Sequence, residues 1–352
     1  MNIKRCEENP IVRPGLFAWR NVSVFNPGAI VEDGKFYLYE RAAGSLRPFL
    51  TSIGLLVSDD GVHFSHLVED PVFTSAMAGY PDGSVQDARV VKIDGLYYMC
   101  YALQPHPMDC WPTGQGVPDY YTQAYPGWKD CAWSMITQSG IAVSADLVHF
   151  RHLSFVTPKD IDDRDVVLFP EKIGGKFALL RRPICRQPGA SDWDRPSIWI
   201  SYSEDLETWT PPRLVAKPAY AWEGGKIGAA ATPIRTEHGW LLLYHGVDEE
   251  SVYRVGAMLL DLADPERVIA RPKDFIMEPQ EYYERFGLVI PNVVFPTGNV
   301  VKDGLLYIYY GCADTAISLA TVPLQDLLDH LLENRISRGT PQPESCGAAN
   351  NR

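Results

Sequence analysis

The sequence predicts an all-β protein, a five-bladed β-propeller with a C-terminal helical extension. Three observations predict this fold: one pattern occurs five times, a second strand pattern follows most copies, and helical patterns are confined to two short stretches. Each copy has a polar turn with glycine followed by alternating aromatic and aliphatic residues, which is typical of a hairpin turn and a strand. Such self-similarity is typical of solenoids and propellers. The copies are VEDGKFYLYERAA (31–43), VKIDGLYYMCYAL (91–103), KIGGKFALLRRPI (172–184), RTEHGWLLLYHGV (235–247) and VKDGLLYIYYGCA (301–313).

A second strand pattern follows four of the copies: IGLLVSDDGVHF, GIAVSADLVHF, SIWISYSEDLETW and VGAMLLDLADP. Three of these segments end in a serine, an acidic residue, a turn and an aromatic residue. Many short strands with few helices are typical of four-stranded blades around an axis. A β-sandwich is the alternative fold, but a sandwich would not need five copies of one unit.

Two stretches have a helical pattern. VPLQDLLDHLLENRI (322–336) places Leu324, Leu327, Leu328 and Leu331 on one face, and PQEYYERFG (279–287) is the other stretch. We expect residues 1–335 to form a single propeller domain and residues 336–352 to form a disordered tail, because the tail is polar and rich in proline and glycine.

The second unit is interrupted by an insertion, residues 104–138, that is rich in proline, tyrosine and tryptophan. A loop this long inside a compact domain usually has a function. Its aromatic side chains could contact a ligand, form an oligomer contact or pack on themselves as a lid.

Composition and charge exclude several classes of protein. Hydrophobic residues make up 46% of the 352 residues and charged residues 22%, which is typical of a globular protein. The net charge of −12 argues against nucleic acid or an anionic membrane as a partner. The first residues, MNIKRCEENP, have no apolar segment typical of a secretory signal, and no run is long enough to span a membrane.

Cysteine usage predicts a cytoplasmic location with reduced thiols. The seven cysteines are scattered and form no CxxC pair. Cys110 and Cys131 lie near the two ends of the insertion, and whether they form a disulfide stays open.

Polar residues that interrupt the apolar strand patterns are the candidates for a site. The first strand of each propeller blade lines the central channel, so we expect these residues on first strands, gathered at one end of the axis. Each also has a simpler interpretation: Asp87 could cap a turn, Arg182 and Arg89 could form structural ion pairs, and His245 could be a core histidine. Their occurrence in all five units favours a shared site. They are Asn26, Arg41, Asp87, Arg182, His245 and Asp314.

Several common site motifs do not occur in the sequence. It has no HExxH motif, HxxxH motif or Cys/His cluster, so we expect no metal. It also has no Walker loop, no GxGxxG after a strand and no GxSxG nucleophile elbow, so we expect no cofactor.

The chain resembles glycoside hydrolase family 130, the inverting β-mannoside phosphorylases and related β-mannosidases, which are five-bladed propellers. The resemblance covers roughly residues 8–331. It rests on these stretches: NPIVRP, FNPGAI, DARV, RDVVLFPEKIGGKFALLRRP, SIWISYSEDLETW, KIGAAATPIRTEHGWLLLYHGV, YRVGAMLLDLADPERVI, PNVVFPTGNV and YYGCADT.

The resemblance implies roles for particular residues. It implies that Asp87 is the general acid, acting through the 3-hydroxyl of the mannosyl unit. It implies a sugar-binding group of Asn26, Arg41 and Asp314. It implies a phosphate pocket made of Arg164, Arg182, Lys226, His245 and Tyr253.

The residue types also favour phosphorolysis over hydrolysis. Inverting hydrolysis needs a general base on a second carboxylate, roughly 6.5–9.5 Å from the acid, whereas phosphate is already an anion and needs only a cationic site. Asp87 has to carry a proton, which burial or a neighbouring carboxylate such as Asp314 would favour.

A β-mannosidase remains the alternative, with Asp165, Glu171 or Glu223 as the base, and a glycan-binding propeller without catalytic activity is a further alternative. The expected small-molecule partners are a β-mannoside and inorganic phosphate, and the protein could form a homo-oligomer. The linkage, the acceptor sugar, the role of the insertion and the oligomeric state stay open.

Overall fold

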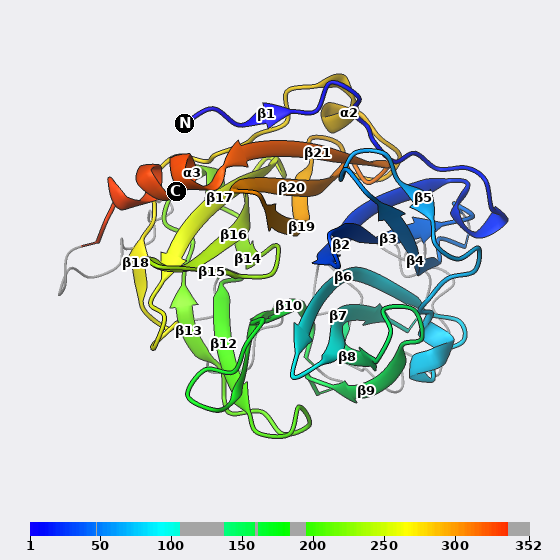
Figure 1. The fold of residues 1–352 in the computed structure, drawn as a ribbon, viewed down its shortest axis with the longest axis horizontal. Coiled ribbons are helices and arrows are strands. Elements are labelled where there is room, and N and C mark those ends of the chain that lie inside the picture. The colour runs from blue at the N-terminus through cyan, green and yellow to red at the C-terminus, as the bar shows by residue number, and fades with distance from the viewer. Residues whose placement is uncertain (47, 106–136, 159–160, 184–194, 337–352) are drawn as a thin grey trace, which may run out of the picture.

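Five antiparallel sheets surround a common centre in the computed structural model, which describes residues 1–46, 48–105, 137–158, 161–183 and 195–336 (Figure 1). The first three sheets each have four strands in sequence order. They are β2 (Ser23–Glu32), β3 (Lys35–Ala43), β4 (Thr51–Ser58) and β5 (Ser65–His66) in blade 1; β6 (Ser84–Ile93), β7 (Leu96–Gln104), β8 (Gln138–Ser144) and β9 (Arg151–Phe155) in blade 2; and β10 (Asp163–Leu168), β11 (Phe177–Pro183), β12 (Ile198–Ser203) and β13 (Arg213–Ala216) in blade 3.

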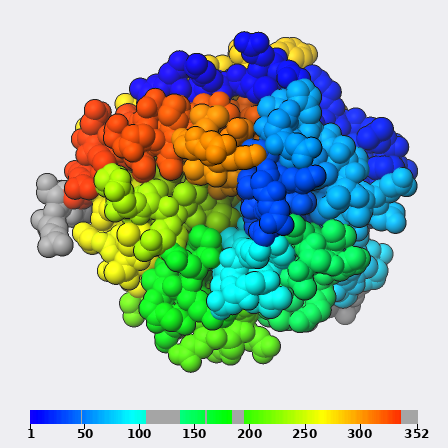
Figure 2. Space-filling model, in the orientation of Figure 1, coloured from blue at the N-terminus to red at the C-terminus, as the bar shows by residue number. Residues whose placement is uncertain are grey.

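The last two sheets depart from this pattern. In blade 4 the inner strand is broken into two pieces that both pair with the second strand, and in blade 5 the outermost strand comes from the N-terminal residues. The elements are β14 (Lys226–Ala229), β15 (Ile234–Thr236), β16 (Gly239–Val247), β17 (Tyr253–Leu260) and β18 (Val268–Ala270) in blade 4, and β19 (Val294–Lys302), β20 (Leu305–Cys312), β21 (Ala316–Pro323) and β1 (Lys4–Arg5) in blade 5. The predicted five-bladed propeller is therefore confirmed, and Figure 2 shows the blades following one another around the centre of one face.

Two-residue turns join the first and second strands of four blades. Asp33 and Gly34 have φ angles of 49° and 77°, and the Asp-Gly turns of blades 2 and 5 and the Gly-Gly turn of blade 3 have similar angles. Such turns match the twist of the strands, and they need residues that tolerate a positive φ. The five repeated sequences are thus the turn and the second strand of each blade, with the first strand ending just before or within each of them.

The hydrophobic core of the described residues has five large clusters, each between two neighbouring blades, and two clusters of three buried residues each. All nine residues of β16 are buried because successive side chains point into the clusters on the two sides of its blade. Burial on both faces explains why the second strands appear as nearly continuous apolar runs.

Among the described residues, α-helices occur at the two predicted places. Helix α3 (Leu324–Leu332) buries Leu327, Leu328 and Leu331 in the cluster between blades 4 and 5, as its sequence pattern predicts. Helix α2 (Tyr282–Arg285) is a single turn. Three-residue and four-residue 3-10 helices are η1 (Ala18–Arg20), η2 (Ser75–Ala78) and η5 (Ala221–Glu223).

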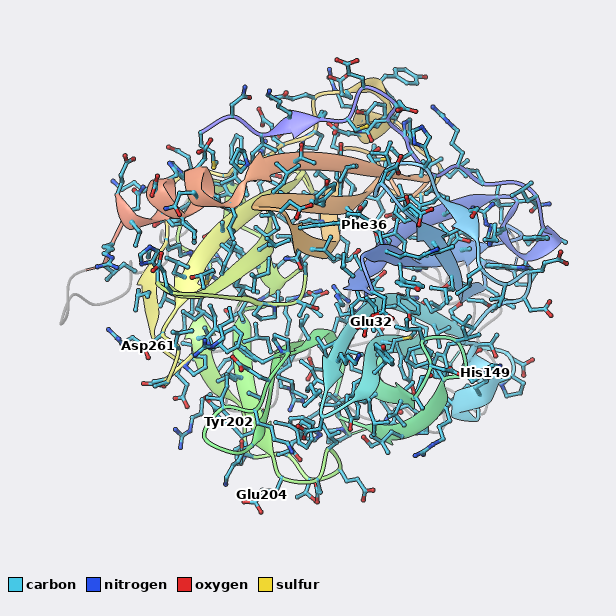
Figure 3. All side chains as sticks on the ribbon, in the orientation of Figure 1. Glu32, Phe36, His149, Tyr202, Glu204 and Asp261 are labelled. Carbon is cyan, nitrogen blue, oxygen red and sulfur yellow. The ribbon has the colours of Figure 1, made fainter. Side chains whose placement is uncertain are left out.

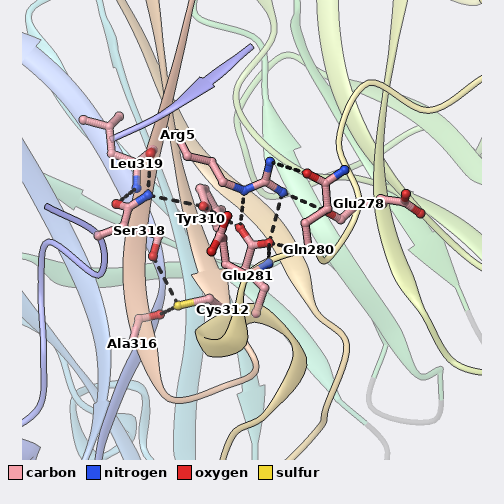
Figure 4. A network of polar contacts seen from close by, with 11 residues as sticks. Arg5, Glu278, Gln280, Glu281, Tyr310, Cys312, Ala316, Ser318 and Leu319 are labelled. Atoms are coloured by element: carbon pink, nitrogen blue, oxygen red, sulfur yellow. Dashed lines mark hydrogen bonds and ion pairs between the residues drawn. The ribbon is translucent and has the colours of Figure 1, made fainter. Parts of the chain in front are cut away.

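An N-terminal strand closes the ring of blades. Lys4 and Arg5 of β1 pair with Thr321 and Ala320 of β21. Arg5 donates two hydrogen bonds to the carboxylate of Glu284, at 2.7 and 3.0 Å, and this carboxylate also accepts one from Tyr310 at 2.8 Å (Figure 4). Glu284 is completely buried, so the network compensates for the removal of its charge from water.

The serine and aspartate that follow the third strand of blades 1 to 3 form one repeated turn. In blade 2, Ser144 donates to Asp146, whose carboxylate accepts the backbone N–H groups of Val148 and His149 at 3.1 and 2.8 Å. The same arrangement occurs around Asp60 and Asp205. Figure 3 places His149 and Glu204, from two of these turns, at the outer edge of the molecule.

Some sequence predictions fall outside the described residues. They are most of the insertion at residues 104–138, the Cys110–Cys131 pair and nearly all of the tail at residues 336–352. Within the described residues, no helix combines the length and apolar character needed to cross a bilayer.

Candidate active site

Four of the five inner strands contain an irregularity at the same point, near one end of the axis. The register of each strand shifts between Phe25 and Gly28, Gln86 and Arg89, Arg164 and Val167, or Phe295 and Gly298. Bulges of this kind redirect a side chain and are frequent beside active sites.

The residue that begins the bulge is polar and left-handed in the first three blades. Asn26, Asp87 and Asp165 have φ angles of 45°, 53° and 53°. Asparagine and aspartate tolerate this conformation better than other residues with a side chain. The counterpart in blade 5 is Pro296, so equivalent positions bear different chemistry, whereas blade 4 has no register shift and places Gly228 opposite His245.

The first half of the site is built around Asp87. Its Oδ1 accepts hydrogen bonds from Asn26 Nδ2 at 2.9 Å and from Arg41 Nη1 at 3.0 Å. Because both bonds fall on Oδ1, Oδ2 is the oxygen available to carry a proton. Asn26 Oδ1 is buried without a hydrogen-bond partner among the described residues, so it can accept one from a ligand.

Asp314 belongs to the same half. It lies in the turn between β20 and β21, has a φ of 49° and is 9% exposed. Burial raises its pKa to about 7; repulsion from Asp87 adds to this effect, while Arg41 and Lys226 oppose it. Asp314 can therefore retain a proton near neutral pH.

The second half of the site is basic and contains one buried carboxylate. Asp165 accepts a hydrogen bond from Arg182 Nε and lies 3.6 Å from His245 Nε2. Lys226 donates to the hydroxyl of Tyr253 at 2.8 Å. The Tyr253 ring in turn stacks on His245, with 5.8 Å between ring centroids. The structure thus brings Tyr253 beside Lys226 and His245, two other residues of the predicted pocket.

Arg164 lies at the edge of this half. It binds both carboxylate oxygens of Asp162, at 3.1 and 3.3 Å. Burial lowers the pKa of Arg164, but Asp162 and the nearby Asp165 and Tyr253 outweigh burial, so the pKa is raised.

His245 is neutral in this arrangement. Burial is the main reason that its pKa falls to about 3, and the cations Arg182, Lys226 and Arg89 lower it further, while Asp165 opposes them. A neutral imidazole has one donor and one acceptor nitrogen. Its Nδ1 has no hydrogen-bond partner among the described residues.

Buried donors without partners indicate an anion site in the basic half. Nη1 of Arg182 has no hydrogen-bond partner within the described part of the chain, although Arg182 is only 4% exposed. Nη2 of Arg89 forms an ion pair with Asp165 at 3.5 Å but no hydrogen bond. Unpaired buried donors are costly, and guanidinium groups match the oxygens of phosphate. A group of at least three His, Cys, Asp or Glu side chains able to hold a metal ion is not found among the described residues.

Gly228 provides the space for this cluster. A Cβ atom at Gly228 would lie 2.5 Å from Cε1 of His245 and 2.8 Å from Cδ of Arg182, and closer still to Asp165. The side chains that form the anion site can therefore meet only because blade 4 has no side chain at this position.

The prediction that the site residues lie on first strands is wrong for four of them. Arg41, Arg182 and His245 lie on the second strands β3, β11 and β16, and Asp314 lies in a turn. All three strand residues remain paired with the first strand of their blade: Arg41 lies opposite Phe25, Arg182 opposite Arg164 and His245 opposite Gly228. Asn26 and Asp87 do lie on first strands, as do Arg164 and Lys226.

Sequence reasoning missed the central position of Asp165 and Arg89. The available signal was the alignment of FNPG, QDAR and RDVV, which places Asn26, Asp87 and Asp165 at one position of the repeat.

The two other carboxylates considered as a general base, Glu223 and Glu171, bind partners outside this cluster. Glu223 is completely buried and binds Arg271 and Tyr244, and Glu171 forms an exposed ion pair with Arg235.

The fold and the site together define an enzyme built on a five-bladed propeller, with buried carboxyl groups and a buried basic cluster near its axis. The model of glycoside hydrolase family 130, described as beta-1,4-mannooligosaccharide phosphorylase, matches residues 117–333. The chain belongs to this family, and the resemblance found in the sequence is confirmed.

Similar proteins extend over almost the whole chain. A 1,2-beta-oligomannan phosphorylase of Thermoanaerobacter sp. (strain X514) is 36% identical over 93% of this chain and 99% of its own length. A beta-1,2-mannobiose phosphorylase of the same organism is 38% identical over 91% of this chain and 97% of its own. The solved beta-1,2-mannobiose phosphorylase of Listeria innocua superimposes with a TM-score of 0.75 at 26% identity, covering 95% of this chain and all of the other.

The raised pKa of Asp314 predicts a pH-dependent stability. The unfolded carboxyl group has a pKa of about 3.8 and the folded one about 7, so the folded state binds more protons between these values and loses stability as the pH rises through them. Asp314→Asn should abolish this loss, which is up to about 4 kcal/mol. Urea unfolding of both proteins at pH 5 and pH 8 measures the difference.

Asp303→Asn is the matched control for this experiment, because Asp303 is also left-handed but lies in an exposed hairpin turn. It should retain the wild-type dependence on pH. Equal pH dependence in wild type and Asp314→Asn would show that Asp314 is not protonated in the folded enzyme.

Proposed function

We propose that this protein is an inverting β-mannoside phosphorylase. It cleaves a β-mannoside with inorganic phosphate and releases α-D-mannose 1-phosphate and a shortened acceptor. The observation that carries the proposal is the pairing of one carboxylic acid, Asp87, with a buried basic cluster that has unpartnered donors. The names of the relatives support the same reaction.

The sugar half would position the mannosyl unit and supply the proton. Asn26, Arg41 and Asp314 would bind its hydroxyl groups, because they surround Asp87 with both donors and acceptors. Asp87 would deliver a proton to the glycosidic oxygen through the 3-hydroxyl of the mannosyl unit. The bond from C1 to the leaving oxygen breaks, and the proton from Asp87 neutralises that oxygen.

The basic half would hold phosphate on the opposite face of the sugar. Arg164, Arg182 and Lys226 would supply positive charge, and His245 and Tyr253 would supply hydrogen bonds. A phosphate oxygen then forms the new bond to C1, and attack from the face opposite the leaving group inverts the anomeric carbon. Phosphate is itself the nucleophile, so no carboxylate base is required.

Asp165 would orient the basic half rather than act as a base. It is buried and ionised: burial alone would raise its pKa, but the charge and hydrogen bond of Arg182, together with the charge of Arg89, hold the pKa well below its usual range. A carboxylate that is ion-paired and hydrogen-bonded to an arginine in this way is a weak proton acceptor. This reasoning disfavours a β-mannosidase mechanism that uses Asp165.

β-1,2-Linked mannosides are the substrates that we propose first. The two Thermoanaerobacter relatives at 36% and 38% identity are named for β-1,2-linked substrates. A Ruminococcus albus relative at 32% identity is named for β-1,4-linked mannooligosaccharides, so both linkages belong in the test.

We also propose a cytoplasmic location, inorganic phosphate as the co-substrate and no bound cofactor. The thiols of Cys6, Cys100 and Cys312 are free, as is usual for a protein kept in a reducing compartment. Nucleic acid and membranes are not expected partners of an acidic protein with a net charge of −12. A homo-oligomer remains compatible with these properties.

Product analysis with and without phosphate tests the reaction. We expect β-1,2-mannobiose to yield mannose 1-phosphate and mannose in equal amounts, and only when phosphate is present. In reverse, mannose 1-phosphate and an acceptor should release phosphate. Free mannose formed at the same rate without phosphate would identify a β-mannosidase, and binding without turnover on a broad glycan panel would identify a non-catalytic propeller.

Asp87→Asn should lower kcat by about 10³-fold, a magnitude typical of losing a general acid. Binding of the mannoside should change little, because the amide oxygen of asparagine can still accept the bonds from Asn26 and Arg41. Steady-state kinetics and calorimetric titration of the mannoside measure the two quantities. Asp94→Asn, in an exposed turn of the same blade, is the control, and turnover of Asp87→Asn near the control value would refute the assignment.

Gly228→Ala should raise the KM for phosphate by at least about tenfold, because the added methyl group displaces His245 and Arg182. The KM for the mannoside should stay close to the wild-type value, since Asn26 and Asp87 lie in other blades. Gly224→Ala is the control, because Gly224 has an ordinary φ of −54°. An unchanged phosphate KM in Gly228→Ala would place the anion elsewhere.

A further inference from the structure

Arg89 lies where four blades meet. It extends from β6 in blade 2, and its Nη1 donates to the backbone carbonyl of Asp87 in the same blade at 2.7 Å. Its Nε donates to the carbonyl of Ala230 in blade 4 at 2.9 Å. Its Nη2 lies 3.5 Å from the carboxylate of Asp165 in blade 3. The guanidinium carbon lies 5.7 Å from the ring centroid of Phe295 in blade 5.

Among the four blades with the bulge, only blade 2 has an arginine at this position of the repeat. The residues that follow the same register shift in blades 1, 3 and 5 are Gly28, Val167 and Gly298. A side chain at Gly28 would collide with the backbone of Ala88, 2.5 Å away. The axis therefore has room for one long side chain at this level, and blade 2 provides it.

The contacts of Arg89 join the two halves of the site. Asp87 presents its side chain from a left-handed bulge, and the hydrogen bond to its carbonyl oxygen fixes the peptide group that follows. The carboxylate of Asp165, on the other side of Arg89, binds Arg182 and faces His245. Ala230 lies at the break between β14 and β15, two residues beyond Gly228.

A buried guanidinium group would be costly without partners, and two of its three nitrogens are bonded to backbone carbonyls rather than to a carboxylate. Its fixed fork of donors suits several acceptors in one plane, and a lysine ammonium cannot reproduce this geometry. The position of the acid and the position of the anion cluster therefore depend on one planar group.

We propose that Arg89 is a positioning residue that couples the phosphate site to the catalytic acid, acting through the Asp87 carbonyl and the Asp165 carboxylate. The proposal rests on the phosphorylase function proposed above. It implies that a change at Arg89 impairs both halves of the site together, whereas Gly228→Ala affects mainly one of them.

Arg89→Lys tests the coupling, with Arg20→Lys as the matched control. Arg20 is also 2% exposed and also bonds to backbone carbonyls, but its carboxylate partner is Glu40, outside the site. We expect both variants to lower the Tm. Arg89→Lys alone should lower kcat by at least about tenfold, raise the phosphate KM by at least about tenfold and reduce the Tm increase that phosphate causes without mannoside.

The outcomes separate this inference from the proposed function. A phosphorolytic wild type with Arg89→Lys kinetics equal to those of Arg20→Lys overturns the coupling and leaves the function intact. A wild type that releases mannose without phosphate overturns the function itself.

Arg89→Gln, whose uncharged amide nitrogen reaches only as far as Nε of the arginine, is the second variant. If Arg89→Lys does not fold, the same loss of kcat and phosphate response in Arg89→Gln supports the proposal. Failure of both variants to fold while Arg20→Lys folds overturns it, because Arg89 would then be required for the fold rather than for the site.

Discussion

Close approach of the inner strands at the propeller axis is the constraint on which the other features depend. A side chain at Gly298 would meet the carbonyl of Pro27 at 2.7 Å, and one at Gly311 would overlap Asn26. A protein interior is packed too densely to absorb such overlaps. Asn26 and Asp165 therefore occupy space that a glycine leaves open in another blade, Gly311 for Asn26 and Gly228 for Asp165.

This constraint explains how a repeated fold makes an unsymmetrical site. Four blades have an equivalent position at the start of the bulge, and these positions are occupied by Asn26, Asp87, Asp165 and Pro296. The acid and its amide neighbour come from blades 1 and 2, the basic groups come from blades 3 and 4, and glycine or proline elsewhere leaves space for them. Substituting one position of the repeat thus changes the chemistry without changing the frame, which is set by the five clusters between blades.

Much of the frame could be predicted from the sequence because its signals are local. Asp-Gly turns followed by alternating apolar residues identify the second strands, and the leucine pattern identifies α3. The contact of Arg41 with Asp87 could not be predicted, because it joins two blades across 46 positions of the chain. The contact between Arg89 and Asp165 could not be predicted either, because it joins two blades and no sequence pattern indicates it.

Ring closure by β1 has a consequence for the order of folding. Lys4 pairs with Thr321, so the last hydrogen bonds of the ring join residues more than 300 positions apart. Contacts of such long range form slowly, because a large loss of chain entropy precedes them. Asp87 and Asp314 are likewise contributed by the second and fifth blades. A nascent chain with only its first four blades therefore contains the acid but lacks its carboxyl neighbour, and catalytic competence arrives with the last blade to be synthesised.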